Sequence, residues 1–390
     1  MKLGYIQSNK EDQARAMQVL KMTSESVALD ELGIGRIRDA FADLMFPGIS
    51  TLQKHTKYFS LMPQVYRKAI ERRYNRLQEV RGEIVRLERI MTENLYNGTE
   101  EKDRKGITGS DAIRKKNGSY VKYDPAYIYN SGLQKFGILR SSQVETAIYS
   151  ASKAFCNLPK ALKSDDEDVA DDLAEKTDLF QFCSFPAVDY DFTKQCSLAL
   201  TTADHDFIVD HILKSEECKR TLLRYLVDAP NIVLPKEFEH LDECALPKEL
   251  AEIQDLARRF ADFMYMVHVR YNYIYSGYQD AEMRDEFNDL LEKYQHSGTD
   301  IDTVLAAVTI RENSGKLFCK EIAERIAAED IEINGELDQI IVNRERRVKG
   351  SRRKIGNPIY RYDKNNRIHY YKLTYRWETV KLFIEELRSV

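Results

Sequence analysis

Apolar and polar residues alternate with a helical period over most of this chain. The longest such stretch covers residues 63–96, where apolar side chains recur at three-, four- and seven-residue spacings. This spacing stacks side chains on one face of an α-helix. We expect one helix here, begun by Pro63 and ended by Asn97-Gly98, with a length of roughly 50 Å at about 1.5 Å per residue. Such a helix would be the spine of the N-terminal region.

Shorter helices are expected on both sides of this spine. Asp30 is a candidate N-cap for a helix ended by Pro47-Gly48, and Ser50 with Gln53 has the spacing of a capping box. Asp124-Pro125 predicts a helix start, which Gly137 closes. Thr201 or Thr202 caps a helix that begins the second half. Further amphipathic patterns lie at 217–227, 247–275, 280–294, 316–328 and 378–387.

Two short segments have the period of β-strands. Residues 119–123 follow an Asn117-Gly118 turn, and residues 358–375 alternate on either side of a polar turn at 363–366. Both patterns are typical of β-hairpins. The predicted fold class is therefore mainly α, multi-helix and two-domain, with the spine over about 63–96 and small β-hairpins at about 119–123 and 358–375.

The clearest change in composition predicts a domain boundary. Residues 164–178 contain eight carboxylates and one lysine. Repulsion between these carboxylates favours an exposed linker, and the alternative is an acidic lure for a basic partner or a metal cluster. The expected division is an N-terminal helical domain at 1–163, a linker at 164–178 and a C-terminal helical domain at 179–390.

Composition restricts the class of protein. The 390 residues are 43% hydrophobic and 31% charged, with a net charge of −4, so nucleic-acid contact would need a local basic patch. The six cysteines lie at least thirteen residues apart, which excludes a CxxC pair and suggests a reducing compartment. Because no signal peptide and no long apolar run is apparent, we expect a cytoplasmic protein without membrane contact.

The C-terminal region has the strongest chemical signal. Residues 344–354 contain seven basic side chains and one acid, and the tyrosines and the tryptophan that follow are interleaved with more cations. Cations neutralise phosphates and aromatic faces stack on bases, so this pattern favours DNA or RNA. The candidate nucleic-acid-binding residues are Arg352, Arg353, Lys354, Arg361, Arg367 and Arg376. An acidic protein partner or an ordinary hairpin core is the alternative.

Catalytic patterns are weak. Asp39 and Asp43 lie four residues apart and could present paired carboxylates to a metal ion, but a surface ion-pair face is the simpler explanation, because a two-metal site needs further acids that the sequence does not identify. His205 and His211 lie about 120° apart on a helix and do not converge as metal ligands. Gly33-Ile34-Gly35 lacks the third glycine of a dinucleotide site, and neither GxxxxGK[ST] nor GxSxG occurs. We expect no resident metal or cofactor, and nothing here requires an enzyme.

Several sequence blocks resemble an uncharacterised bacterial family of unknown function. The opening blocks are LGIG at 32–35, IRDAFAD at 37–43, FPG at 46–48 and ST at 50–51, and later ones are YIY at 127–129, FGI at 136–138 and LTYRW at 373–377. Leu139 stands where the family pattern has an arginine, which implies weaker phosphate contact there. The resemblance implies a place among bacterial antiviral defence genes, beside helicases and phospholipase-D-type nucleases.

Two hypotheses of different classes follow. In the first, the protein is a non-enzymatic accessory subunit of a defence complex that binds partner proteins and touches nucleic acid through its basic C-terminal hairpin. In the second, it is a metal-dependent nuclease or toxic effector that uses Asp39 and Asp43. A scaffold that binds only proteins is a third reading.

Overall fold

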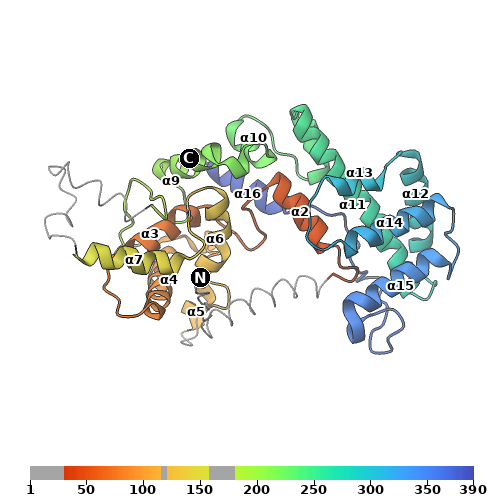
Figure 1. The fold of residues 1–390 in the computed structure, drawn as a ribbon, viewed down its shortest axis with the longest axis horizontal. Helices are drawn as coiled ribbons and strands as arrows, with labels where there is room; N and C mark the ends of the chain where they lie inside the picture. The colour runs from red at the N-terminus through yellow and green to blue at the C-terminus, as the bar shows by residue number, and fades with distance from the viewer. Residues whose placement is uncertain (1–29, 116–120, 158–180) are drawn as a thin grey trace, which may run out of the picture. The chain divides into compact units, whose positions relative to one another are not determined.

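The computed structural model describes the backbone of residues 30–115, 121–157 and 181–390. These residues are mainly helical and contain no β-strand, and their one isolated β-bridge joins Leu139 and Cys183. The expected mainly α class is confirmed. The chain folds into two compact units, each assembled from separate stretches of sequence (Figure 1). Unit 1 holds residues 30–44 and Ala245–Tyr375, and unit 2 holds Met45–Cys244 and Arg376–Val390.

Unit 2 is a helical assembly around an aromatic core. Phe59 lies 4.9 Å from Phe136 and 5.6 Å from Phe383 between ring centroids, so three helices distant in sequence meet there. Aromatic pairs at such distances add to the stability that burial provides. The helices of this unit are α3 (Tyr58–Ile70), α4 (Gln78–Gly98), α5 (Ser110–Lys115), α6 (Pro125–Lys135), α7 (Val144–Asn157), α9 (Thr202–Lys214), α10 (Leu222–Asp228) and α16 (Trp377–Leu387).

The expected spine helix over 63–96 is wrong. The structure has two helices there, α3 and α4, which pack against each other, and Pro63 lies inside α3 instead of at its start. The chain leaves the helix at 71–77, where the buried Tyr74 donates its hydroxyl to the Ala69 carbonyl at 2.6 Å. The Asn75 amide donates to Glu79 at 3.0 Å, which satisfies a backbone group before α4 begins. The seven-residue spacing continues across this turn, so periodicity alone does not reveal it.

Unit 1 is built around a long central helix. The second half of α11 (Lys248–Tyr275) is almost wholly buried, because α12 (Ala281–His296), α13 (Ile301–Ala306) and α15 (Glu336–Lys349) pack against it. α14 (Ser314–Ala327) packs on α13 and α15, and the short η6 (Gly350–Arg352) follows. α2 (Gly35–Met45) contributes Phe41, which stacks on Phe260 of α11 at 5.5 Å.

The expected β-hairpin at 358–375 is also wrong. This segment, here called the strap, has extended backbone and turns but no strand pairing. It is hydrogen-bonded to α11 at two places. The Asn272 amide both donates to the Ile368 carbonyl and accepts from its N–H, each at 2.8 Å. At the end of the strap, the Tyr375 hydroxyl donates to the Ala257 carbonyl at 2.6 Å. Helix side chains therefore take the place of a second strand, which explains the alternating pattern without a hairpin.

Local helix signals are largely confirmed. Asp124 accepts from the Tyr127 amide at 2.9 Å and caps α6, and Thr201 forms a capping box with Asp204 on α9. Asp30 accepts three backbone N–H groups before α2. Gln53 accepts from the Ser50 amide at 3.0 Å, but the residues that follow form turns and the next helix starts only at Tyr58. The expected helices at 247–275, 280–294, 316–328 and 378–387 correspond to α11, α12, α14 and α16.

Several expectations fall wholly or partly outside the described residues. These are the N-terminal elements before residue 30, the acidic segment 164–178, and residues 119–120 of the first predicted hairpin, whose residues 121–123 form no strand. The division of the chain at 164–178 therefore stays a prediction. None of the six cysteines, all of which lie within the described residues, takes part in a disulfide. Among the described helices none is both long and apolar enough to cross a membrane.

Candidate nucleic-acid interface

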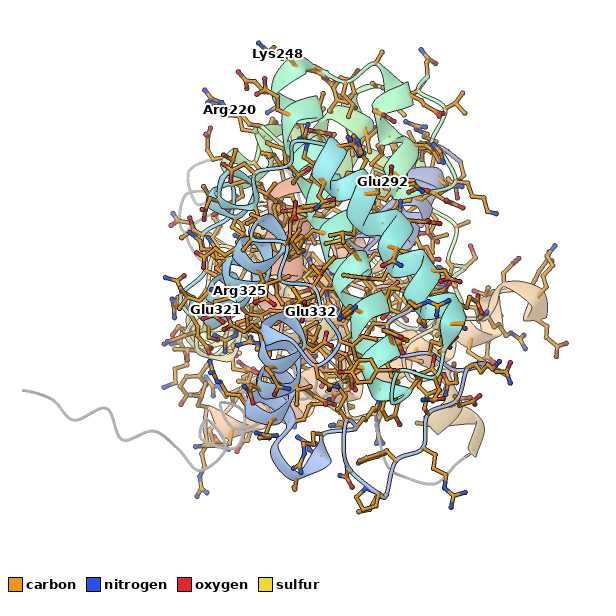
Figure 2. The ribbon with its side chains drawn as sticks, turned by 90° about the vertical axis from the view of Figure 1, so that its right-hand side faces the viewer. Arg220, Lys248, Glu292, Glu321, Arg325 and Glu332 are labelled. Carbon is orange, nitrogen blue, oxygen red and sulfur yellow. The ribbon has the colours of Figure 1, made fainter. Side chains whose placement is uncertain are left out.

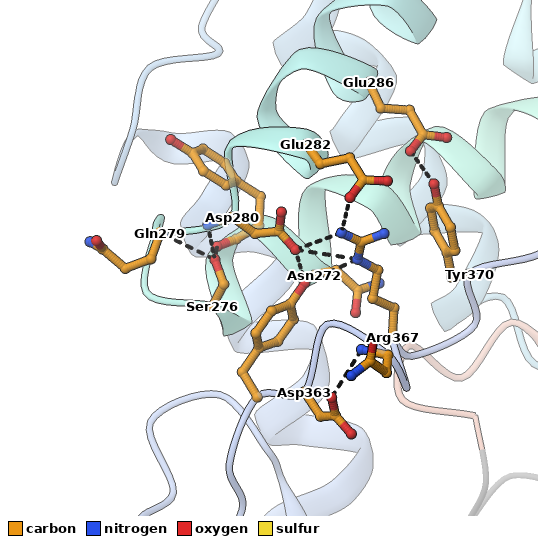
Figure 3. A network of polar contacts seen from close by, with 12 residues as sticks. Asn272, Ser276, Gln279, Asp280, Glu282, Glu286, Asp363, Arg367 and Tyr370 are labelled. Atoms are coloured by element: carbon orange, nitrogen blue, oxygen red, sulfur yellow. Dashed lines mark hydrogen bonds and ion pairs between the residues drawn. The ribbon is translucent and has the colours of Figure 1, made fainter.

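Two cations of the strap and one just before it are neutralised by acids of unit 1. Arg367 is the clearest case, because only 8% of its side chain is exposed and its guanidinium bonds Asp280 at 2.9 Å and Glu282 at 2.6 Å (Figure 3). The hydrogen bond to Glu282, with further help from Tyr362 and Asp280, raises the pKa of Arg367. Lys372 pairs with Asp262 of α11 in the same way, at 2.9 Å. The third cation is Lys354, just before the strap in sequence.

Lys354 belongs to a buried charge cluster centred on Glu31. The Glu31 carboxylate accepts from Lys354 at 2.9 Å and from His369 at 2.5 Å, and Lys349 lies 3.6 Å away. Burial alone would raise the pKa of Glu31, but the hydrogen bonds from His369 and Lys354 lower it to about 2. The neighbouring His268 is fully buried, which lowers its pKa to about 3 and keeps it neutral. Lys354 therefore holds the fold together and is not presented to a polyanion.

Arg376 belongs to the other unit. It precedes α16 in unit 2, with a φ of 67°, and its guanidinium donates to the Ile49 carbonyl at 2.7 Å. Arg361 is exposed and has no ion-pair partner within the described part of the chain. The predicted set of six cations thus does not lie together on one hairpin.

The tyrosines of the strap also fall into two groups, those hydrogen-bonded to acids of unit 1 and those exposed to solvent. Tyr362 donates to Asp280 at 2.5 Å, and Tyr370 donates to Glu286 at 2.5 Å. These hydroxyls fasten the strap to α12, so their rings are not free platforms for bases (Figure 3). Tyr360 and Tyr371 are the exposed exceptions, at 38% and 60%.

A different group of cations is available to solvent. At the end of α15 and in the residues that follow it, Arg346, Arg347 and Arg352 are exposed and Arg353 is half-buried; we call these four residues the basic end of α15. Within the described residues no carboxylate pairs with any of the four guanidiniums, and Arg346 donates a 3.3 Å hydrogen bond to the Asn343 side chain. By contrast, Arg325 of α14 pairs with Glu336 at 2.5 Å.

The sequence indicated only part of this group. The sequence predicts Arg352 and Arg353 as site residues, whereas it indicates Arg346 and Arg347 only as members of a basic run. The signal that distinguishes them is helical phase. Arg344 and Lys349 of the same run face inward and are 5% and 7% exposed, which leaves the residues between them on the outer face.

The predicted carboxylate pair lies on α2. Asp39 accepts from the neighbouring Arg38 at 3.0–3.1 Å and is 39% exposed, and Asp43 lies one turn further on at the surface. Among the described residues, three possible metal ligands lie within 4.8 Å of one another at Glu237, Glu239 and His240, whose side chains are exposed or half-buried. Neither Asp39 nor Asp43 belongs to this group. Over the part of the chain that the structure describes, the pair is therefore not joined by the further acid that two-metal chemistry needs.

The two histidines of α9 are hydrogen-bonded to different groups. His205 contacts Asp206 at 2.9 Å, while His211 bonds the Phe207 carbonyl of its own helix at 2.7 Å. Burial lowers the pKa of His211 below its ordinary value. Asp210 is bound to Lys214 at 2.7 Å, so these groups do not form a common site.

These features define an all-helical protein, over its described residues, that has an exposed group of guanidiniums on one of its two units. The chain belongs to a family of unknown function (DUF6361), whose family model matches residues 1–314. No curated protein and no solved structure matched.

Proposed function

We propose that this protein is a non-enzymatic binding subunit that contacts the phosphate backbone of nucleic acid through the basic end of α15. The observation that supports this proposal is the set of four guanidiniums without a carboxylate partner among the described residues. Guanidiniums bind phosphates by forked hydrogen bonds and by charge, and such contacts need no sequence-specific pocket.

Helix electrostatics accounts for only half of this group. Cations near a helix C-terminus interact favourably with the helix dipole, and Arg346 and Arg347 lie in the last turn of α15. Arg352 and Arg353 come after the helix has ended, in η6 and at its cap. Four mutually repelling cations are best accommodated when an external polyanion neutralises them.

The accessory role rests on the resemblance and on the sites. The resemblance to proteins of bacterial antiviral defence loci supports a cytoplasmic complex with protein partners, for which a helicase or a phospholipase-D-type nuclease is the expected class. The arrangement of Asp39 and Asp43 offers no support for a nuclease centre, since no third ligand joins them among the described residues. No cofactor is part of the proposal.

The direct test is salt-dependent binding of labelled single-stranded DNA, duplex DNA and RNA by the full-length chain, measured by fluorescence anisotropy. We expect the affinity to fall steeply between about 50 and 200 mM salt. Arg352→Gln with Arg353→Gln should weaken binding and lower the log–log salt slope by about one per cation removed.

A matched double variant controls for net charge. Arg220→Gln with Lys248→Gln removes two exposed cations far in sequence from the basic end of α15 (Figure 2). This variant should bind like the unmodified protein. Equal weakening by both pairs, or no binding by the unmodified chain at low salt, would contradict the proposal and would leave a scaffold that binds proteins alone.

A further inference from the structure

A cavity of about 190 Å³ lies in unit 1 between the start of α2, the start of α14 and the last turns of α15. Its charged lining consists of three arginines and one acid, Arg36, Arg344, Arg347 and Glu312. A water molecule needs only about 10–15 Å³ of such space, so the cavity has room for a polyatomic ion together with solvent.

Two glycines allow the walls of this cavity to approach closely. Gly33 has a φ of +65°, and a Cβ there would lie 2.9 Å from Val348 and 3.0 Å from the Arg344 guanidinium. A Cβ on Gly315 would lie 3.3 Å from Ile37. The glycines therefore leave the Arg344 side chain room at the back of the cavity. This requirement gives a structural reason for the LGIG block at 32–35.

Arg344 is the unusual charge in this lining. It is 5% exposed, and its guanidinium donates to the carbonyls of Leu32 at 2.7 Å, Gly33 at 3.1 Å and Ser314 at 3.2 Å. These acceptors are neutral, and no carboxylate pairs with Arg344 among the described residues. Burial accordingly lowers the pKa of Arg344. A buried cation without a counter-ion is costly and is relieved when an anion binds nearby.

Glu312 is the one acid of the lining. Its carboxylate pairs with Arg36 at 2.9 Å and accepts from the Ser314 hydroxyl at 3.0 Å. Both side chains are about half exposed, at 48% and 57%, so this ion pair contributes little stability. With three cations and one anion, the lining carries a net charge of +2. Glu312 thus acts as a tethered anion that a stronger one can displace from Arg36.

The start of α14 adds hydrogen-bond donors beside these charges. Its N-cap residue, Asn313, makes no side-chain cap hydrogen bond, whereas Asp300 caps α13 through the amides of Asp302 and Thr303. The first amides of α14 therefore lack the usual side-chain acceptor. They supplement the arginines, which carry most of the positive charge.

We infer that this cavity binds a phosphate monoester dianion between Arg36, Arg344 and Arg347, with Glu312 displaced. A terminal phosphate on an oligonucleotide and the phosphate of a free nucleotide share this chemistry. The inference goes beyond the proposed function, because contacts to the phosphodiester backbone need no enclosed site. It uses one residue of the basic end of α15, Arg347, and otherwise depends on different residues.

The test compares 5′-phosphorylated and 5′-hydroxyl oligonucleotides of identical sequence, measured by anisotropy with the full chain. We expect the terminal phosphate to tighten binding about tenfold, the gain typical of one charge-assisted contact. Adenosine monophosphate and inorganic phosphate serve as competitors. Competition by either at millimolar concentration assigns the site to small phosphates, and competition only by phosphorylated strands assigns it to strand ends.

Two matched pairs of variants locate the effect. Arg347→Gln should abolish the gain, whereas the adjacent Arg346→Gln, outside the lining, should keep it. Glu312→Gln should increase the gain, because the internal competitor is removed, whereas Glu321→Gln, on the α14 helix that follows Glu312, should leave it unchanged (Figure 2). Equal binding of the two oligonucleotides by the unmodified protein overturns the inference. Salt-dependent binding that persists in that case would leave the backbone contact of the proposed function standing.

Discussion

The basic end of α15 and the strap lie close together in the sequence, and both are rich in arginine and lysine. In the strap, Arg367 is neutralised by Asp280 and Glu282, and Lys372 by Asp262, while Arg361 stays exposed. At the basic end of α15 the guanidiniums have no such acids among the described residues. The two regions therefore have opposite roles: one fastens unit 1 together, and the other is available to an external anion. A basic run in the sequence can bind an external anion only where the fold leaves its cations without internal acidic partners.

The distance in sequence between the paired groups explains why the regions look alike before folding. Asp280 lies 87 residues before Arg367, and Glu31 lies 338 residues before His369. No local pattern connects such residues. The same long-range pairs make the comparison testable by substitution, because a fastening cation and a free cation respond differently.

Substitution of Arg367 should have the largest effect. Arg367→Gln leaves Asp280, which is 4% exposed, without its cation, and we expect a loss of about 3 kcal/mol in the free energy of unfolding. Urea denaturation measures this loss. Arg352→Gln removes an exposed cation and should change stability by less than about 0.5 kcal/mol. Equal losses for both variants would remove the distinction between the two regions.

Protonation of Glu31 at low pH should have the second-largest effect on stability. The pKa of Glu31 is about 2 in the folded protein and is ordinarily 4.5, so the unfolded chain takes up this proton first as the pH falls. The contribution of Glu31 to stability is therefore complete above about pH 4.5 and is lost progressively toward pH 2. Urea midpoints measured across this range should fall less steeply for Glu31→Gln than for the unmodified protein. If the urea midpoint of Glu31→Gln depends on pH in the same way as that of the unmodified protein, the Glu31 carboxylate does not stabilise the contact between α15 and the strap.

Removal of a strap hydroxyl should have the smallest effect. Tyr370→Phe loses the 2.5 Å hydrogen bond to Glu286, and we expect a loss of about 1 kcal/mol, because Tyr265 still donates to that carboxylate. Tyr360→Phe, on an exposed ring without a hydrogen bond to any described residue, is the control. If thermal unfolding shows no difference between these variants, the strap is not held by its tyrosines.

The sequence predicted the helices whose signals are local. Asp124-Pro125 gave the start of α6, and Thr201 gave the start of α9, because capping depends on neighbouring residues alone. The turn between α3 and α4 escaped prediction, since the apolar period continues through it. α15 was not predicted because its inner face carries Arg344, Glu345 and Lys349, which read as a polar run. These residues are satisfied by partners far away in the chain, such as Tyr271, which donates to Glu345 at 2.7 Å.

The candidate site was predictable to the same degree. Arg352 and Arg353 could be identified because exposure near a chain turn follows from their own neighbourhood. The cavity could not, since Gly33, Glu312 and Arg344 come together only when α2, α14 and α15 pack. Likewise, nothing near Lys354 or Arg367 indicates the acids that neutralise them.

Arginine footprinting tests the central distinction most directly. The full-length protein is treated with a guanidinium-specific dicarbonyl reagent, with and without nucleic acid, and each modified arginine is quantified by mass spectrometry. We expect Arg347 and Arg352 to react rapidly in the free protein and to be protected by nucleic acid, while Arg367 reacts slowly in both states. Rapid modification of Arg367, or unchanged reactivity of Arg347 and Arg352 when nucleic acid is present, would contradict the account.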